Sequence, residues 1–579
     1  MAAHPPLPGR SVSLNPAKAE SPPRWRSGAV AVALHLTLAL IVTTPVIGTG
    51  MVGHPEVDVW NHAWGLWWFW DCFTHVRAPL YTTVLNAPAG GWLWFIDPIG
   101  AAFGMWWVPL VGLTAAWNLT LVALVTAASV AGAQLADAVG AGLRSRWIGA
   151  VGVAASAHVV SELHNGISEA VGVAWGVFAL AALLRALANP ERARGWVVTG
   201  LLGGLTLLGT YYYALSLALV AIAILLDALR TTPRRLLLRG VLLGAIPAAC
   251  IAIPVVLLIH HTVADGETAI IPRQSGTWQE RFWALEHNAV DPLSLVVPGN
   301  FQSVDLAALG ESFRHSSYLG WLVLVPAWFA ARRRLLWVAA VPLVLSLGPY
   351  LWCGGGWVEL AGRRFALPYR LLLEVMPAEA IAHPQRIGFL GMALIAALGA
   401  SAVSERWAPW VAGGLLVELL LVSPAPWPIA KTGELDTSYA EFIAAAEPEP
   451  TVRGAPLVVD IPAEAPGNGM ASSRYLVFQA VHGRPIPYGP NVRKDCFRAF
   501  KSQAATAIVL GDPALLASMT SADFHRGELG WIALHTDLGD PDAGGTAALE
   551  ARLRELLGAP RELGPVRLWD VRGLQPAAE

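Results

Sequence analysis

Two carboxylates lie two residues apart in a polar segment that follows the first long apolar stretch of the chain. Glu56 and Asp58 are flanked by His54 and His62. In an extended segment, side chains at positions i and i+2 point to the same side. Two such carboxylates can share Mg²⁺ or Mn²⁺, and the histidines would allow Zn²⁺ instead. Two alternatives remain open: a single carboxylate acts as a general base, or all four are solvated loop residues.

Glu162, His164 and Glu169 form a second polar group, in a short segment between two later apolar stretches. His158 lies four residues before Glu162, so the two would share one face of a helix. Ionisable groups at the end of a membrane span are costly unless they are used or reach water. This group is therefore a second candidate for the site, and a solvated turn is the alternative.

Several arginines fall in segments that we predict to lie on the same side of the membrane. A guanidinium group suits a lipid phosphate because it can make two parallel hydrogen bonds with phosphate oxygens. Arg386, just before an apolar stretch, and Arg370 are the candidates for phosphate binding. The alternative for each is an interfacial side chain that reaches lipid headgroups. The full set is Arg273, Arg363, Arg364, Arg370 and Arg386.

The composition places these residues in a membrane protein. Of the 579 residues, 55% are hydrophobic and only 14% are charged, whereas a soluble protein carries about 25% charged residues. A net charge of -2 without a dominant basic patch argues against nucleic acid as a partner. The four cysteines are widely spaced, and they define neither a CxxC motif nor a disulfide framework.

Apolar stretches long enough to cross a bilayer recur along the chain. They predict about eleven spans, near 28–47, 114–137, 147–161, 170–188, 196–212, 214–229, 240–259, 317–331, 335–352, 386–403 and 408–424. Arginines support the order of the loops, because every short loop on one side is basic when the N-terminus lies inside. An odd number of spans then places the C-terminal segment outside.

The chain divides into three parts on this basis. Residues 1–27 form a disordered cytoplasmic tail, and residues 28–424 form the transmembrane domain with a long first outside loop at 48–113. We expect residues 425–579 to form a small outside α/β domain that contributes to acceptor recognition and not to the chemical step. The strands expected in it are 457–461, 475–481, 507–510, 531–535 and 566–571. A helix is expected at 546–557.

The order of these features resembles the GT-C superfamily of polytopic glycosyltransferases, and most of all its poorly characterised bacterial members. The resemblance is carried by the acidic-x-acidic motif in the first outside loop and by the Trp-rich and Pro-rich segments at 58–70 and 79–98. A Pro-x-Arg motif precedes a late span, at residues 384–386, and segments 474–486 and 566–571 are similar to parts of the family's external domain. The second loop lacks the clean acidic pair of the family.

This resemblance implies transfer of a hexose or pentose from a polyprenyl-phosphate donor to an unknown glycan, lipid or protein acceptor. It implies a place in the bacterial inner (cytoplasmic) membrane, with the reaction on the outer side and a role in the cell envelope. By the same analogy, Asp58 is the catalytic base or metal ligand and Glu56 assists it. Arg386 meets the donor phosphate, and Glu162, His164 or Glu169 supplies the second acidic loop.

Other classes of function receive less support from the sequence. The chain contains no P-loop, HExxH or GxSxG motif. A membrane transporter or an assembly factor for envelope polymers is the main alternative. A transporter would show charged residues near mid-span and interrupted helices in paired halves, whereas the polar residues here gather at the outer ends of the spans. A metal-dependent hydrolase is a third and weaker alternative, because no dense set of ligands occurs.

Overall fold

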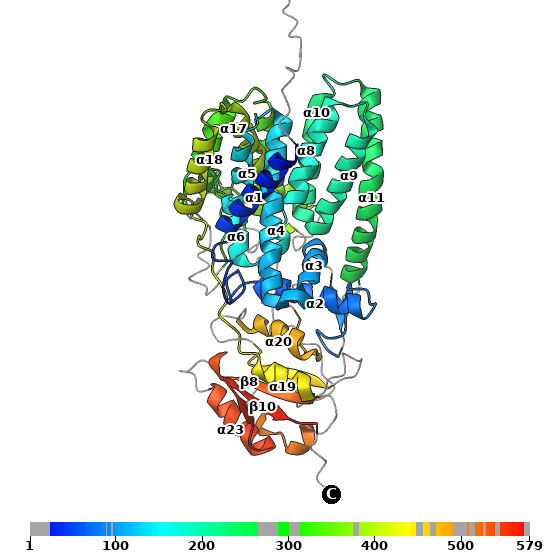
Figure 1. The fold of residues 1–579 in the computed structure, drawn as a ribbon. Coiled ribbons are helices and arrows are strands. Elements are labelled where there is room, and N and C mark those ends of the chain that lie inside the picture. The colour runs from blue at the N-terminus through cyan, green and yellow to red at the C-terminus, as the bar shows by residue number, and fades with distance from the viewer. Residues whose placement is uncertain are drawn as a thin grey trace, which may run out of the picture.

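The computed structural model describes most of the chain. The described residues are 24–88, 90–93, 97–264, 288–299, 301, 313–374, 381–446, 456–463, 471–489, 507–508, 516–524, 529–538 and 545–572. The predicted tail therefore lies almost wholly outside the described residues, and so do Arg273 and most of the second long outside loop. Figure 1 shows an elongated molecule, with a bundle of long helices at one end and a small sheet at the other.

The helix bundle holds most of the apolar sequence. Its helices and their bounds are α1 (Arg24–Val42), α4 (Val108–Val139), α5 (Arg146–Ala154), α6 (Ala157–Asn165), α7 (Ser168–Val171), α8 (Ala174–Ala188), α9 (Ala193–Gly209), α10 (Tyr211–Ala228), α11 (Arg234–Ala264), α13 (Trp321–Trp328), α14 (Leu335–Ser346), α16 (Pro384–Ile387), α17 (Phe389–Ala402) and α18 (Ala408–Val417). A π-helical turn, Glu418–Val422, extends α18.

Five helical segments among the described residues are long and apolar enough to cross a membrane, and four shorter apolar helices accompany them. By length and composition these helices mark a multi-pass membrane protein, as the sequence predicted. The stretch expected at 147–161 is interrupted between α5 and α6, where the Ser156 hydroxyl accepts the backbone N–H of Val159 (3.3 Å) and starts a new helix. The count of eleven spans stays a prediction.

The first outside loop folds into its own small elements. They are α2 (Val59–Thr74), the hairpin β1 (Tyr81–Thr82) and β2 (Gly91–Trp92), and α3 (Pro98–Gly104). Figure 1 shows α2 and α3 at the end of the helix bundle that faces the sheet. The Trp-rich sequence of α2 is buried along much of its length, with Trp64 and Trp68 almost fully enclosed.

The C-terminal part contains a four-stranded sheet in the order β7-β8-β10-β9. β7 (Leu457–Ile461) runs parallel to β8 (Leu529–His535), and the other neighbours, β10 (Val566–Asp570) and β9 (Arg561–Leu563), pair antiparallel. The helices are α19 (Ser438–Ala446), α20 (Tyr475–His482) and α23 (Gly545–Leu557). The strands predicted at 457–461, 531–535 and 566–571 and the helix at 546–557 are confirmed.

One predicted strand is wrong. Residues 475–481 form the helix α20, which ends at Gly483 in the left-handed conformation (φ 67°). A short apolar run of this kind fits a buried helix as well as a buried strand, and only the packing partners decide. Of the strand expected at 507–510, only residues 507 and 508 are among those described.

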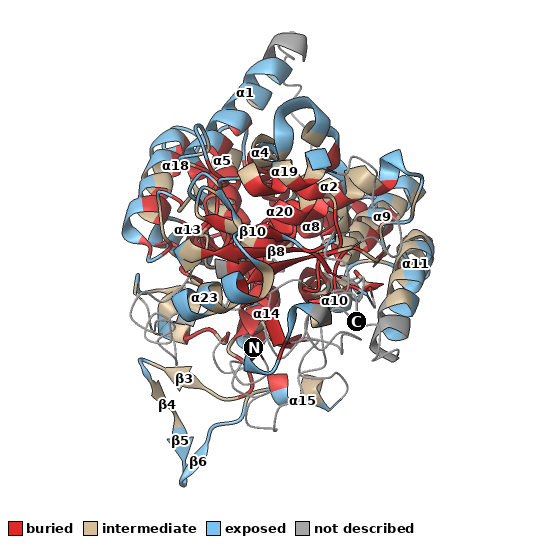
Figure 2. Cartoon of the chain, turned by 90° about the horizontal axis from the view of Figure 1, so that it is seen from below, coloured by how far each residue is buried: buried red, intermediate tan, exposed pale blue. Residues whose placement is uncertain are grey.

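The buried apolar residues form two main clusters. One fills the helix bundle, and the other fills the C-terminal part together with the first outside loop. The second cluster joins Trp64, Trp68 and Leu85 of the loop to residues of β7, β8 and α20. In Figure 2 the buried strands and helices of this part lie at the centre, surrounded by exposed segments. The first outside loop and the C-terminal part thus share one core.

A long loop after α14 forms an exposed ribbon that projects from the molecule (Figure 2). It consists of two short hairpins, β3 (Trp352–Cys353) with β4 (Gly356–Trp357), and β5 (Glu359–Leu360) with β6 (Arg363–Arg364). The helix α15 (Tyr369–Leu373) follows it. The ribbon carries Arg363 and Arg364, and α15 carries Arg370; all three are exposed.

Candidate functional site

The two polar segments singled out in the sequence meet through their backbones. Gly53 precedes the first segment and Gly166 ends α6, and both have positive φ angles, +126° and +68°. A Cβ atom on Gly166 would come within 2.6 Å of the Cβ of Val59, the first residue of α2. The backbone N–H of His54 donates to the carbonyl of His164 (2.7 Å). Only glycine permits this approach, and it brings the start of α2 against α6 and α7.

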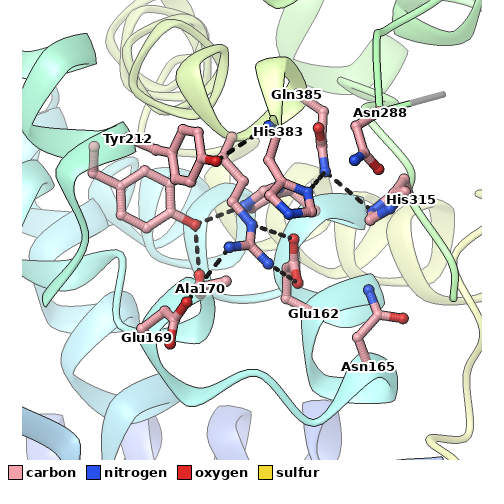
Figure 3. Close-up of polar contacts among 12 residues, drawn as sticks. Glu162, Asn165, Glu169, Ala170, Tyr212, Asn288, His315, His383 and Gln385 are labelled. Carbon is pink, nitrogen blue, oxygen red and sulfur yellow. Dashed lines mark hydrogen bonds and ion pairs between the residues drawn. The ribbon is translucent and has the colours of Figure 1, made fainter. Parts of the chain in front are cut away.

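At the centre of the site, one guanidinium lies between two carboxylates (Figure 3). Arg386, on α16, donates from Nε to Oε1 of Glu162 (3.2 Å), and its Nη2 lies 3.4 Å from Oε2 of the same carboxylate. Its Nη1 lies 3.5 Å from Oε1 of Glu169 on α7. Arg386 and Glu162 are 4% and 1% exposed, while Glu169 is 20% exposed. The three groups together carry a formal charge of -1 when both carboxylates are ionised.

His62 connects α2 to this cluster. Its Nδ1 lies 3.5 Å from Oε2 of Glu169 and 3.4 Å from the hydroxyl of Ser168. Burial and then the Arg386 charge lower the pKa of His62 to about 3, although Glu162 acts in the opposite direction. His62 is therefore neutral at pH 7 and can accept or donate a hydrogen bond without carrying charge.

Two further carboxylates interact electrostatically with Glu169. Asp58 is half-buried at the N-cap of α2, and its Oδ1 accepts from the Asn61 amide (3.0 Å). Asp97 is buried at the N-cap of α3, and its Oδ1 accepts the backbone N–H of Gly100 (2.8 Å). Burial raises the pKa of Asp97, which its hydrogen bonds partly oppose. The N-termini of two short helices thus hold carboxylates beside the partly exposed Glu169.

Gln385, the residue before Arg386 in α16, lies between two histidine rings (Figure 3). The Gln385 amide nitrogen lies 3.3 Å from Nδ1 of His315 and 3.4 Å from Nδ1 of His383. In this orientation of the amide, both rings accept at Nδ1 and hold their proton at Nε2. Burial lowers the pKa of His315 to about 4. The amide oxygen of Gln385 is buried without a hydrogen-bond partner among the described residues.

Another histidine connects the start of α6 to α10. His158 Nε2 lies 2.7 Å from the hydroxyl of Tyr213, which in turn donates to the carbonyl of Ala170 (2.6 Å). Beside it, the hydroxyl of Tyr212 accepts the backbone N–H of His383 (3.2 Å). These bonds fix α7 and the start of α16, which carry Glu169 and Arg386.

The structure brings together most of the residues predicted for the site, with some placed at its edge. His54 and Glu56 lie near the surface of the first loop, 3.9 Å apart, and their side chains are 26% and 41% exposed. The rings of His54 and His164 lie 5.1 Å apart. Arg370 lies apart from this cluster, on α15, where its guanidinium packs over the Tyr350 ring at 5.5 Å.

Arg314 was missed by the sequence reasoning. Its backbone pairs with the Asn165 side chain through two bonds: Arg314 N–H to Oδ1 (2.9 Å) and Asn165 Nδ2 to the Arg314 carbonyl (2.8 Å). The half-buried guanidinium donates only to the carbonyl of Phe313 among the described residues, and it has no carboxylate partner there. Its charge also lowers the pKa of His54, after burial. No motif marks Arg314 in the sequence, because its place depends on a residue 149 positions away.

The residues proposed as metal ligands do not form a compact set. No group of three or more His, Cys, Asp or Glu side chains among the described residues is arranged to hold a metal ion. His62 points to Glu169 and His54 to Glu56, so the four candidates His54, Glu56, Asp58 and His62 do not converge. The divalent cation therefore stays a prediction.

The fold can now be compared with solved structures. An oligosaccharyltransferase of Archaeoglobus fulgidus, tethered with an acceptor peptide, superposes with a TM-score of 0.53 at 12% identity, over 91% of this chain and 71% of that one. Arabinofuranosyltransferase AftD from Mycobacteria gives 0.50 at 15% identity, over 95% of this chain and 40% of AftD. The archaeal enzyme AglB from A. fulgidus, with an inhibitory peptide and a dolichol-phosphate, gives 0.50 at 12% identity, over 91% of this chain and 72% of AglB.

These likenesses define the class of fold. The chain has the fold of the GT-C membrane glycosyltransferases, which confirms the resemblance seen in the sequence at the level of the fold. The chain spans less than half of the length of AftD. No family model matches the sequence, and no curated protein matches it.

Proposed function

We propose that this protein is a membrane glycosyltransferase that moves a sugar from a polyprenyl-phosphate donor to an acceptor hydroxyl. One observation carries the proposal: several carboxylates, one buried arginine and neutral histidines converge where α2, α6, α7 and α16 meet. The fold supports it, since the compared structures are glycosyltransferases and one of them holds a dolichol-phosphate, itself a polyprenyl phosphate. A transporter would need polar groups along a path, whereas these groups form one local cluster.

The half-buried carboxylates supply the proton acceptor. In the proposed reaction the acceptor oxygen attacks C1 of the sugar and its proton passes to Asp58 or Glu169. The bond between C1 and the phosphate oxygen breaks, and the polyprenyl phosphate leaves with those electrons. Asp58 is our first choice because its carboxylate is half-buried at the N-cap of α2, whereas Glu169 lies against Arg386.

Arg314 supports a revised place for the donor phosphate. The sequence assigned the phosphate to Arg386 and Arg370, but Arg386 lies between two carboxylates. A phosphate at Arg386 would have to compete with both carboxylates, and like charges oppose it. Arg314 lies at the edge of the same cluster without a carboxylate partner among the described residues. We therefore propose that Arg314 binds the phosphate and that Arg386 orients Glu169 and Glu162.

The neutral polar group fits the sugar itself. Sugar hydroxyls are recognised by uncharged donors and acceptors, and Gln385, His315 and His383 provide both kinds. The unpartnered amide oxygen of Gln385 and the buried hydroxyl of Ser316 are acceptors that a sugar hydroxyl would satisfy. The outer side of the bacterial inner membrane, an envelope acceptor and the choice between hexose and pentose remain part of this proposal.

The test of the reaction is Asp58→Asn in the full-length protein. Loss of a general base should lower the rate of sugar transfer by about 10²-fold or more, with the amount of folded protein unchanged. Asp71→Asn, on the same helix but paired with Arg77, is the matched control and should keep its rate. The assay is transfer from radiolabelled polyprenyl-phosphate sugars in membranes.

Two results would change the assignment. Near-normal transfer by Asp58→Asn together with loss in Glu169→Gln would move the base to Glu169 and leave the reaction class intact. If the wild-type protein transferred no sugar from any hexosyl or pentosyl polyprenyl phosphate to envelope material, the proposed function itself would be wrong.

A further inference from the structure

The helix that begins at Asp58 is held from two sides by parts of the chain that are far apart in sequence. On the side of the site, His62 contacts Glu169 and Ser168. On another face of α2, the indole N–H of Trp64 donates to Oε1 of Gln479 on α20 at 2.6 Å. Positions 62 and 64 point about 160° apart around a helix, because successive residues turn by 100°. Figure 1 shows α20 lying between α2 and the C-terminal sheet.

The bond between Trp64 and Gln479 is fully enclosed. Trp64 is 1% exposed and Gln479 is 0% exposed. The amide nitrogen of Gln479 donates to the Arg484 carbonyl (3.3 Å), which fixes its oxygen toward α2. Trp64 also stacks on Trp68, with ring centroids 5.5 Å apart and planes 10° apart. Neither partner can turn to water for a substitute hydrogen bond, so loss of either leaves an unpaired buried group.

Backbone bonds attach the rest of the first outside loop to the same C-terminal segment. Asn86 N–H donates to the Tyr488 carbonyl (2.8 Å), and Ala87 N–H donates to the Ile486 carbonyl (3.0 Å). Ile486 N–H returns a bond to the carbonyl of Val84 (2.8 Å). The same C-terminal segment is joined to the sheet, because Val458 of β7 donates to the Pro485 carbonyl (3.0 Å). The sheet, α20 and the loop therefore form one rigid connection to α2.

We propose that Gln479 is a positioning residue: the C-terminal part sets the orientation of α2 through the Trp64–Gln479 bond, and so aligns Asp58 and His62 with Glu169. The inference rests on the proposed function for its effect on turnover, but the position of α2 can be measured without it. It assigns to the C-terminal part a positioning role in the chemical step, whereas the sequence predicted acceptor recognition alone. Small misplacements of reacting groups are costly, about 10²-fold in rate for 1 Å.

The activity test compares variants that remove one partner each. Gln479→Leu removes the acceptor at similar volume, and Trp64→Phe removes the donor. We expect kcat to fall about tenfold or more in each, with the KM for the polyprenyl-phosphate donor unchanged. Gln479→Glu keeps an acceptor oxygen and should recover part of the rate. Trp68→Phe is the matched control, because its indole N–H bonds to Pro79 within the first loop (2.9 Å); its kcat should stay within about twofold of wild type.

The second test needs no substrate. Cysteines replace His62 and Ser168, which lie across the junction of α2 and α7, in a full-length chain whose other cysteines are changed to serine. The rate of oxidative cross-linking reports the position of α2. Adding Gln479→Leu or Trp64→Phe should slow cross-linking at least fivefold, and adding Trp68→Phe should not.

The outcomes are separable. If the cross-linking rate and kcat both stay at the wild-type level in Gln479→Leu and Trp64→Phe, the positioning role is refuted. The positioning role is also refuted if kcat and the KM for the donor change by equal factors while the cross-linking rate stays at the wild-type level. If cross-linking slows as expected but even the wild-type protein transfers no sugar, the positioning of α2 stands and the proposed function fails. Should Gln479→Leu fail to accumulate, Trp64→Phe and its control Trp68→Phe give the same comparison from the donor side of the bond.

Discussion

At the scale of single residues, the ion pair of Arg386 with Glu162 decides how the site is held. Both side chains are almost fully buried, so each needs the other to offset the cost of leaving water. Arg386→Met should lower the free energy of unfolding by about 3–5 kcal/mol, because two carboxylates then lose their cation. Thermal unfolding of the purified protein in detergent measures the change.

A surface ion pair serves as the control for that substitution. Arg554 of α23 bonds to Glu550 at 2.7 Å but is 40% exposed. Arg554→Met should therefore leave the melting temperature close to that of wild type, because exposed ion pairs contribute little to stability. The double variant Arg386→Met with Glu162→Leu should recover part of the loss, because one uncompensated charge is removed. Equal melting temperatures for Arg386→Met and wild type would contradict the buried pair as a structural element.

His62 predicts a dependence of stability on pH. Its pKa is about 3 in the folded protein, against about 6.5 for an ordinary histidine, and burial is the main cause. The unfolded chain therefore binds a proton below about pH 6.5 that the folded protein does not bind until about pH 3. Stability should be complete above pH 6.5 and should fall as the pH drops below it.

The measurement is the melting temperature in detergent at pH 7.5 and pH 5.5 for wild type and His62→Gln. The difference between the two temperatures should be smaller in the variant, since one of the groups that resist protonation is gone. The pKa values of His54, His315 and His482 are also lowered, so these residues destabilise the folded protein in acid in the same way. Some acid sensitivity will therefore remain in the variant. An unchanged difference would show that His62 is not buried neutral beside Glu169.

At the scale of elements, the close approach of α6 to α2 is the contact on which the site depends. Gly166 has φ +68°, and a Cβ there would lie 2.6 to 2.9 Å from Val59 atoms. Gly166→Ala should both strain the backbone and push α2 away from Glu169. Gly140→Ala is the matched control: its φ is +104°, but nothing lies within 4 Å of its Cβ position.

Backbone strain alone costs about 1–2 kcal/mol for a residue in the left-handed region. Both alanine variants should show that loss in thermal unfolding. Gly166→Ala alone should lose more stability than backbone strain explains. It alone should also lose sugar transfer. If the two variants behaved alike, the contact between Gly166 and α2 would have no part in the site.

The sequence indicated elements better than it indicated partners. Long apolar runs located α4, α8, α10 and α17, and short strand-like runs located β7, β8 and β10. Every residue of β7 and β8 is buried, so these strands are marked by composition and length and not by alternation. The same signal failed for α20, whose short apolar run carries no clear period. Contacts between residues that are distant in sequence produce no such pattern. Arg386 and Glu162 are 224 residues apart, and Arg314 and Asn165 are 149 apart. The acidic pair was visible because its members are neighbours in sequence.

At the scale of the whole molecule, the two main hydrophobic cores hold different elements around the site. The core of the helix bundle includes residues of α6 and α7, a smaller cluster with Tyr212 and Leu345 holds Ile387 of α16, and the second core joins the first outside loop to the C-terminal part. The site lies at the junction of the two, where α2 contacts both. Residues 425–579 are therefore joined to the first outside loop by shared packing as well as by the chain itself.

The same arrangement bears on the predicted topology. The arginines of the short loops, with an odd number of spans, predict an inside N-terminus and residues 425–579 outside. Because the C-terminal part packs against the first outside loop, the site and the sheet must lie on the same side of the membrane. A membrane-impermeant thiol reagent applied to intact cells should therefore label a cysteine at Ala548, an exposed position on α23, in a chain whose native cysteines are changed to serine. Glu191→Cys, exposed in a predicted inside loop, should react only after lysis. Labelling of the Glu191 position in intact cells, with Ala548 protected until lysis, would invert the topology and place the proposed reaction on the cytoplasmic side.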